Sequence, residues 1–170
     1  MLKQQLQTDV KEAMKQGNQD VLGVLRLALA AIAAKEKEKR YAASKEKPEA
    51  TETELIEISA LGDDEIIGVL SSEVKKRRDT ITLYEQGNRP ELAENEKKEI
   101  AVLQKYLPEQ LSHEELKKLV QESITATGAS SIKEMGKVMA DLSPKIKGKA
   151  EGGEVSKIVR AHLENTPPAI

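Results

Sequence analysis

A lysine- and glycine-rich turn near the end of the chain carries the residues best suited to chemistry. Lys145, Lys147 and Lys149 occupy alternate positions, with Gly148 between the last two and Gly152 shortly after them. Glycine exposes backbone N–H groups and the lysines supply positive charge, which together suit contact with phosphate. A solvated turn between two helices would use the same residues. The residues alone leave both interpretations open.

Other basic residues could extend such a site. Lys137 and Lys157 are predicted to lie on the two helices that flank the turn. A second basic cluster contains Arg77 and Arg78, with Arg26 as a further candidate member. Arg77 falls on the apolar seam of its predicted helix, where an arginine usually finds a buried carboxylate or extends its stem to solvent. We therefore favour a structural role for this second cluster over RNA binding.

The remaining reactive side chains predict no catalytic residue, no metal site and no cofactor. The chain has no cysteine, and its two histidines, His113 and His162, are far apart in sequence. A hydrolase triad needs a nucleophile, a base and an orienting group, and neither histidine adjoins a serine-containing elbow. The histidines do not have the spacing of helical metal ligands, and the lysine–glycine turn lacks the glycine spacing of a nucleotide-binding loop. Phosphate contact by positive charge is the chemistry that remains.

Composition limits both the core and the mode of nucleic-acid recognition. The chain contains no Phe, no Trp and only three tyrosines, so the core must be aliphatic and no base-stacking platform is expected. The net charge of −2 argues against bulk attraction to nucleic acid, although the last helical region is locally basic. The longest apolar run, Leu27–Ala34, is too short to span a membrane. We expect a cytoplasmic protein, because the lack of cysteine suits a reducing compartment and the N-terminus does not resemble a signal peptide.

Hydrophobic spacing predicts an all-α fold. Apolar residues recur every three or four positions in each segment, and glycine, proline or a capping serine marks most helix ends. Capping boxes are predicted at Ser112 with Glu115 and at Ser131 with Glu134. The polar residues 44–53 are predicted to form a loop. The helices are expected over residues 2–16, 19–40, 55–58, 64–86, 90–107 and 113–127, and two more helices have apolar stripes that run from Ile132 to Leu142 and from Val155 to Leu163.

The same pattern predicts two subdomains. The segment Tyr106–Leu111, with Pro108 in its middle, is the best boundary. We expect residues 1–108 to form an N-terminal helical hairpin or bundle. Residues 112–165 are expected to form a small C-terminal three-helix bundle, followed by a tail at 166–170.

Short motifs along the whole chain carry a resemblance to a known family. In the last third they are Met135-Gly136-Lys137-Val138-Met139, Lys145, Lys147-Gly148-Lys149-Ala150-Glu151-Gly152 and Val155-Ser156. Upstream they are Arg26-Leu27, Arg77-Arg78-Asp79, Ala101-Val102-Leu103 and Tyr106-Leu107-Pro108-Glu109-Gln110-Leu111. Together they resemble the GatB/YqeY family, from Leu2 to about Leu163. The chain looks like a free-standing YqeY-like protein without the amidotransferase core.

This resemblance implies an all-helical, two-part fold and an association with tRNA. In the amidotransferase B subunit, the related tail domain contacts the tRNA whose aminoacyl group is amidated, while the chemistry takes place elsewhere. The implied function is a tRNA- or structured-RNA-binding accessory protein, with an amidotransferase or a synthetase as partner. The alternative is a helical protein-interaction module, which the long hairpin and its Lys/Glu surface suggest. Carbon–nitrogen ligase activity with glutamine as amido-N-donor is a label that the family alone implies.

Overall fold

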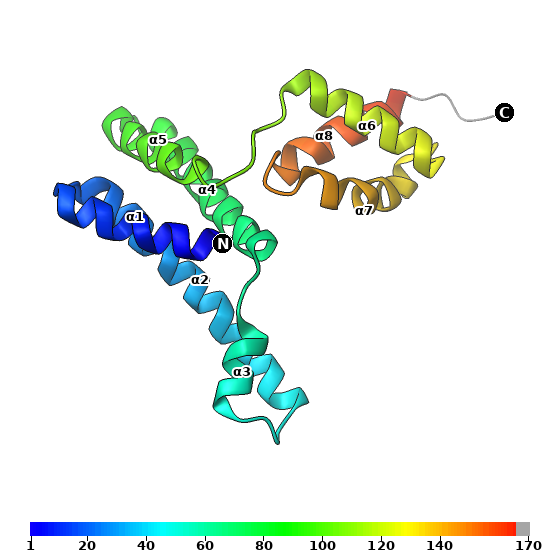
Figure 1. The fold of residues 1–170 in the computed structure, drawn as a ribbon. Coiled ribbons are helices and arrows are strands. Elements are labelled where there is room, and N and C mark those ends of the chain that lie inside the picture. Colours follow the sequence, from blue (N-terminus) through cyan, green and yellow to red (C-terminus); the bar gives the residue numbers. More distant parts are fainter. Residues whose placement is uncertain (166–170) are drawn as a thin grey trace. The chain divides into compact units, whose positions relative to one another are not determined.

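The structure, a computed structural model, describes residues 1–165, and all regular secondary structure in that part is helical. The all-α prediction is confirmed. The predicted tail, 166–170, lies outside the described residues. Figure 1 shows the elements, which are α1 (Leu2–Gln16), α2 (Gln19–Glu46), α3 (Glu52–Ser59), α4 (Asp63–Gln86), α5 (Pro90–Gln104), α6 (His113–Thr127), the 3₁₀ helix η1 (Ile132–Glu134), α7 (Met135–Ile146) and α8 (Gly152–Asn165).

The chain divides into two compact units, one from Met1 to Leu107 and one that begins at Pro108. α2 is the central helix of the first unit and packs against α1, α3, α4 and α5. Its Leu25 and Ile32 join Leu6 and Leu70 in one fully buried aliphatic cluster. Burial of this aliphatic surface drives the helices together, since neither Phe nor Trp is present to add aromatic area.

The segment predicted as a loop over 44–53 is a loop only at residues 47–51, so that prediction is right in its middle and wrong at both ends. α2 continues to Glu46, and α3 begins at Glu52. A capping box starts α3, because Thr51 Oγ1 accepts the Glu54 N–H at 3.3 Å and Glu54 Oε2 accepts the Thr51 N–H at 2.8 Å. α3 packs against the end of α2 (Figure 1), and the buried Ala43 gives that end an apolar contact which stabilises its last turns.

α5 ends at Gln104, before the predicted end at residue 107. The chain leaves the helix through a turn in which the Tyr106 N–H donates to the Leu103 carbonyl at 3.1 Å. The Tyr106 ring is buried, and its hydroxyl donates to Asp9 Oδ2 at 2.5 Å. Burial, followed by the contact with Asp9, raises the pKa of the Tyr106 hydroxyl. The turn thereby places an aromatic ring and a hydrogen bond between the end of α5 and α1.

The second unit is a three-helix bundle of α6, α7 and α8 around an aliphatic core (Figure 1). Val120, Leu142 and Val159 are fully buried there. α7 continues through Pro144 to Ile146, into the lysine–glycine turn that the sequence predicts to begin at Lys145. Proline costs a helix one backbone hydrogen bond, but the burial of Ile146 in the core opposes that cost.

The sequence predicts two capping boxes in this unit, of which one forms and the other does not. Ser112 and Glu115 form the predicted box at the start of α6. At the other box, Glu134 Oε2 accepts the N–H of Ser130 at 2.9 Å and its hydroxyl at 3.3 Å, whereas the Ser131 side chain makes no capping bond. The 3₁₀ helix η1 precedes α7 and is wound more tightly than an α-helix. Glu134 therefore meets Ser130, one position before the Ser131 that α-helical spacing predicts.

Candidate nucleic-acid interface

The basic turn, which we define as residues 147–151, connects α7 to α8. The N–H groups of Lys149 and Ala150 both donate to the Ile146 carbonyl, at 2.8 and 3.1 Å, and so close the end of α7. Gly148 has φ +74°, in the left-handed region that glycine adopts without strain. Lys147 and Lys149, on either side of it, are exposed. The turn thus places two ammonium groups around a tightly folded backbone.

The segment that precedes α6 also holds the basic turn, through hydrogen bonds to its backbone carbonyls. Gln110 Nε2 donates to the Gly148 carbonyl at 2.6 Å and to the Pro108 carbonyl at 3.1 Å. The Leu111 N–H donates to the Lys149 carbonyl at 2.8 Å. The sequence analysis assigned no role to Gln110, because its partner lies 38 positions away and no local pattern relates the two.

Lys145 does not belong to the basic turn, which corrects the sequence prediction. It lies in the last turn of α7, with its Nζ 2.6 Å from Asp141 Oδ2. The hydroxyl of the buried Ser123 donates to the same oxygen at 2.6 Å. Lys145, followed by Ser123, lowers the pKa of Asp141. The charge of Lys145 is therefore neutralised locally, because the extension of α7 brings Asp141 one helical turn before it.

Lys137 is also neutralised, while Lys157 is not. The Lys137 Nζ lies 2.9 Å from Glu134 Oε1. The Ser130 N–H, together with Lys137, lowers the pKa of Glu134 to about 2. Lys157 is exposed on α8, whose first residue is the exposed Gly152. Of the predicted lysines, Lys147, Lys149 and Lys157 form no ion pair within the described residues 1–165.

Arg77 of the second basic cluster is a buried structural residue, as the sequence predicts. It is 8% exposed on α4. Its guanidinium reaches Glu73 Oε2 at 3.2 Å and Glu99 Oε2 at 3.0 Å, with Glu96 Oε2 at 4.0 Å. Burial raises the pKa of Glu73, but hydrogen bonds from Lys76 and Arg77 outweigh it and leave that pKa lowered. Burial and the neighbouring Glu99 raise the pKa of Glu96, against the opposing effect of Arg77.

The other two members of that cluster are placed differently. Arg78 follows Arg77 on α4 and is half-buried. Arg26 is exposed on α2, and its Nη2 contacts Met14 Sδ at 3.9 Å. The contacts of Arg26 and Arg77 are thus separate, with a thioether in one case and three carboxylates in the other. Arg26 and Arg77 therefore share no partner.

A family model described as "Yqey-like protein" matches residues 3–163. The chain belongs to the YqeY-like family. The match spans both units, so it includes the basic turn and the arginines of α2 and α4. No curated protein matches this chain.

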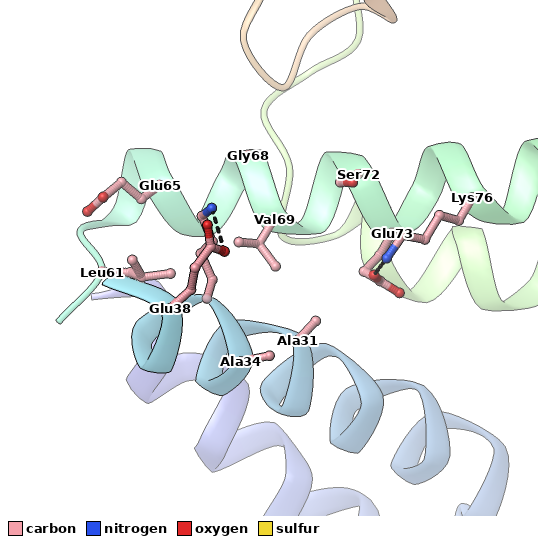
Figure 2. A pocket seen from close by; sticks show the side chains of 11 residues that line it. Ala31, Ala34, Glu38, Leu61, Glu65, Gly68, Val69, Ser72, Glu73 and Lys76 are labelled. Atoms are coloured by element: carbon pink, nitrogen blue, oxygen red, sulfur yellow. Dashed lines mark hydrogen bonds and ion pairs between the residues drawn. The ribbon is translucent and has the colours of Figure 1, made fainter. Parts of the chain in front are cut away.

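A second concave feature of the YqeY-like chain lies between α2 and α4 in the first unit. It is an open groove of about 570 Å³. Figure 2 shows Ala31 and Ala34 from α2 facing Gly68 and Val69 from α4, and these small side chains leave the groove open. Its charged edges are paired, with Lys35 Nζ 2.8 Å from Glu38 Oε2 and Lys76 Nζ 2.7 Å from Glu73 Oε1.

The described part of the YqeY-like chain offers neither a membrane span nor a metal-binding cluster. Within residues 1–165, no helix is both long and apolar enough to cross a lipid bilayer. The same residues contain no group of three or more His, Cys, Asp and Glu side chains that could hold a metal ion.

Proposed function

We propose that this YqeY-like protein is a tRNA- or structured-RNA-binding accessory module that contacts the phosphate backbone through the basic turn. The observation that carries the proposal is the pair of exposed ammonium groups of Lys147 and Lys149. They lie on either side of Gly148 in a turn whose backbone is held by hydrogen bonds, and neither forms an ion pair within residues 1–165. Two charges on a backbone that is already ordered lose less entropy on binding than two charges on a flexible loop.

The start of α8 adds to the favourable field for an anion. α8 begins at Gly152, so the positive end of its helix dipole directly follows the turn that contains Lys149. Two acidic side chains, Glu109 and Glu115, line a hollow together with Gln110 and Lys149, and Glu115 is already engaged in the cap of α6. Its carboxylate accepts the N–H and hydroxyl of Ser112, at 2.8 and 2.7 Å, and those bonds compete with any contact to Lys149.

The mode of recognition follows from the distribution of aromatic residues. Tyr41, Tyr84 and Tyr106 all lie in the first unit, and the chain has no Phe or Trp. The unit that contains the basic turn therefore has no aromatic side chain on which bases could stack. Contacts to phosphate alone favour a folded RNA, which presents its backbone in a fixed arrangement.

The identity of the RNA and of the partner rests on the resemblance to the tail domain of the amidotransferase B subunit. That resemblance supports tRNA as ligand and an amidotransferase or a synthetase as protein partner, and the cysteine-free composition suits the reducing cytoplasm. We assign no catalytic residue in this chain, so the carbon–nitrogen ligase label describes the related amidotransferases. Purified protein that formed an amide from glutamine without a partner would contradict this assignment.

The proposal is tested by binding of tRNA over a salt series. The double variant Lys147→Ala/Lys149→Ala should bind more weakly, with the slope of log K against log salt reduced by about 2, because two phosphate contacts are lost. Lys117→Ala/Lys118→Ala is the matched control, since it removes two exposed lysines from α6 of the same unit. Lys145→Gln should have a small effect, because Asp141 already neutralises that lysine. An equal loss in the control, or no loss in the test variant, contradicts the proposal.

The α2–α4 groove supports protein interaction as the second candidate function. Its apolar floor and paired edges are typical of a groove that accepts a partner helix. Ala34 and Ala33 are both exposed on α2, but only Ala34 lines the groove. A partner that survives nuclease treatment, and that is lost with Ala34→Glu but retained with Ala33→Glu, would favour this function over RNA binding.

A further inference from the structure

The side chain of Gln110 is held between two carbonyl groups. Its Nε2 lies 2.6 Å from the Gly148 oxygen and 3.1 Å from the Pro108 oxygen. Carbonyl oxygens only accept hydrogen bonds, so the NH₂ end of the amide must face both of them, and each of its hydrogens has a partner. Pro108 belongs to the same short segment as Gln110, whereas Gly148 belongs to the basic turn. The amide therefore joins the segment before α6 to the middle of the turn.

The hydrogen bond acts on the most adaptable residue of the turn. Gly148 has φ +74°, and glycine has no side chain that would keep it there. The Lys149 N–H, bonded to Ile146, and the Lys149 carbonyl, bonded to Leu111, restrain the residue that follows. The Gly148 carbonyl itself is held by Gln110, so this bond restrains the peptide group that joins Gly148 to Lys149. Without it, only the Lys149 N–H would hold that peptide group, so the group could tilt about this one bond and change the direction in which Lys149 leaves the backbone.

We infer that Gln110 is a positioning residue for the basic turn, which holds Lys147 and Lys149 in the arrangement that meets two phosphates. The inference rests on the proposed RNA-binding function. Gln110 acts through the Gly148 carbonyl and does not itself contact the ligand. The position of the two ammonium groups is then set by a residue 38 positions upstream, outside the basic motif.

The test compares Gln110→Leu with the wild-type protein in tRNA binding at low salt. Leucine has a similar size and no charge, so the variant removes the two hydrogen bonds with little change in the local field. We expect binding about three- to tenfold weaker, because one hydrogen bond that orders the site is lost. We also expect changed ¹H–¹⁵N chemical shifts at Gly148 and Lys149. Gln121→Leu is the control, since Gln121 is an exposed glutamine of α6 in the same unit, and it should bind as the wild type does.

A second variant separates positioning from folding. Gln110→Asn keeps a solvated amide but is one methylene shorter, so it should lose the bond to Gly148 and give the same weakening as Gln110→Leu. Wild-type affinity in Gln110→Leu or Gln110→Asn, in folded protein, would overturn the inference while the proposed function stands. If the wild-type protein does not bind tRNA, the proposed function fails, and the positioning role fails with it. Far-UV circular dichroism verifies that each variant is folded.

Discussion

Replacing Arg77 with methionine tests how much the ion pairs around the Arg77 guanidinium stabilise the first unit. Methionine keeps most of the apolar stem and fills a similar space, but it removes the guanidinium. Three carboxylates then lose their shared cation, those of Glu73, Glu96 and Glu99. Their side chains are 16%, 23% and 37% exposed, so water compensates them only in part.

The size of the effect follows from this burial. Removing one partner of a buried ion pair costs about 3–5 kcal/mol, because a charge is left uncompensated. The partial exposure of Glu96 and Glu99 places Arg77→Met at the lower end, a loss of about 3 kcal/mol in the free energy of unfolding. The neighbouring Lys76→Met is the matched control. The Lys76 side chain is 69% exposed, so the loss of its ion pair with Glu73 should cost less than about 1 kcal/mol.

The assay can follow the first unit alone, because all three tyrosines lie in it. Urea unfolding monitored by tyrosine fluorescence should shift by about 1–2 M in Arg77→Met, for a slope of about 2 kcal/mol per M. The pKa of Glu73 is lowered in the folded protein, so its stabilising contribution is present above the unfolded pKa and is lost as pH falls. The difference between wild type and variant should therefore shrink from about pH 7 to about pH 4. A loss below about 1 kcal/mol, or one that does not change with pH, would refute the ion-pair argument.

Three further predictions follow from single residues. Leu142→Ala should destabilise the second unit by about 3 kcal/mol, because Leu142 is fully buried; unfolding by far-UV circular dichroism should change while the tyrosine signal does not. Tyr106→Phe should lose about 1 kcal/mol with the bond to Asp9. Since the folded pKa of Tyr106 is raised, its contribution is complete below about pH 10 and is lost as pH rises further, and a stability series that does not fall there contradicts it. The pKa of Glu134 is lowered to about 2, so the second unit should lose stability as pH falls from the unfolded carboxyl value toward 2. Acid unfolding of Glu134→Gln should lack this pH dependence, which the wild type should show. Ser130→Pro should weaken the dependence, because it removes the backbone N–H that is the largest cause of the lowered pKa.

Local patterns were sufficient to locate most helices. Gly17 ends α1 in a left-handed conformation, and the Ser112–Glu115 box starts α6, both as the sequence predicts. These signals work because each capping interaction is completed within a few residues. Two of the predictions that were wrong, the ends of the loop over 44–53 and the start of the lysine–glycine turn at Lys145, concern segments whose extent depends on burial. Ala43 and Ile146 extend their helices through contacts with other elements, and those contacts leave no mark on local spacing.

The candidate site shows the same division between local and distant interactions. Residue types and spacing alone established an all-α chain with an aliphatic core, a lysine–glycine turn and an arginine on an apolar seam, because each of these depends on composition or periodicity. Which charges remain available depended on the folded arrangement: Asp141 neutralises Lys145, three carboxylates surround Arg77, and Gln110 reaches Gly148. An ion pair or hydrogen bond requires two groups within about 3–4 Å. For residues 22 or 38 positions apart, only helix packing brings them to that distance.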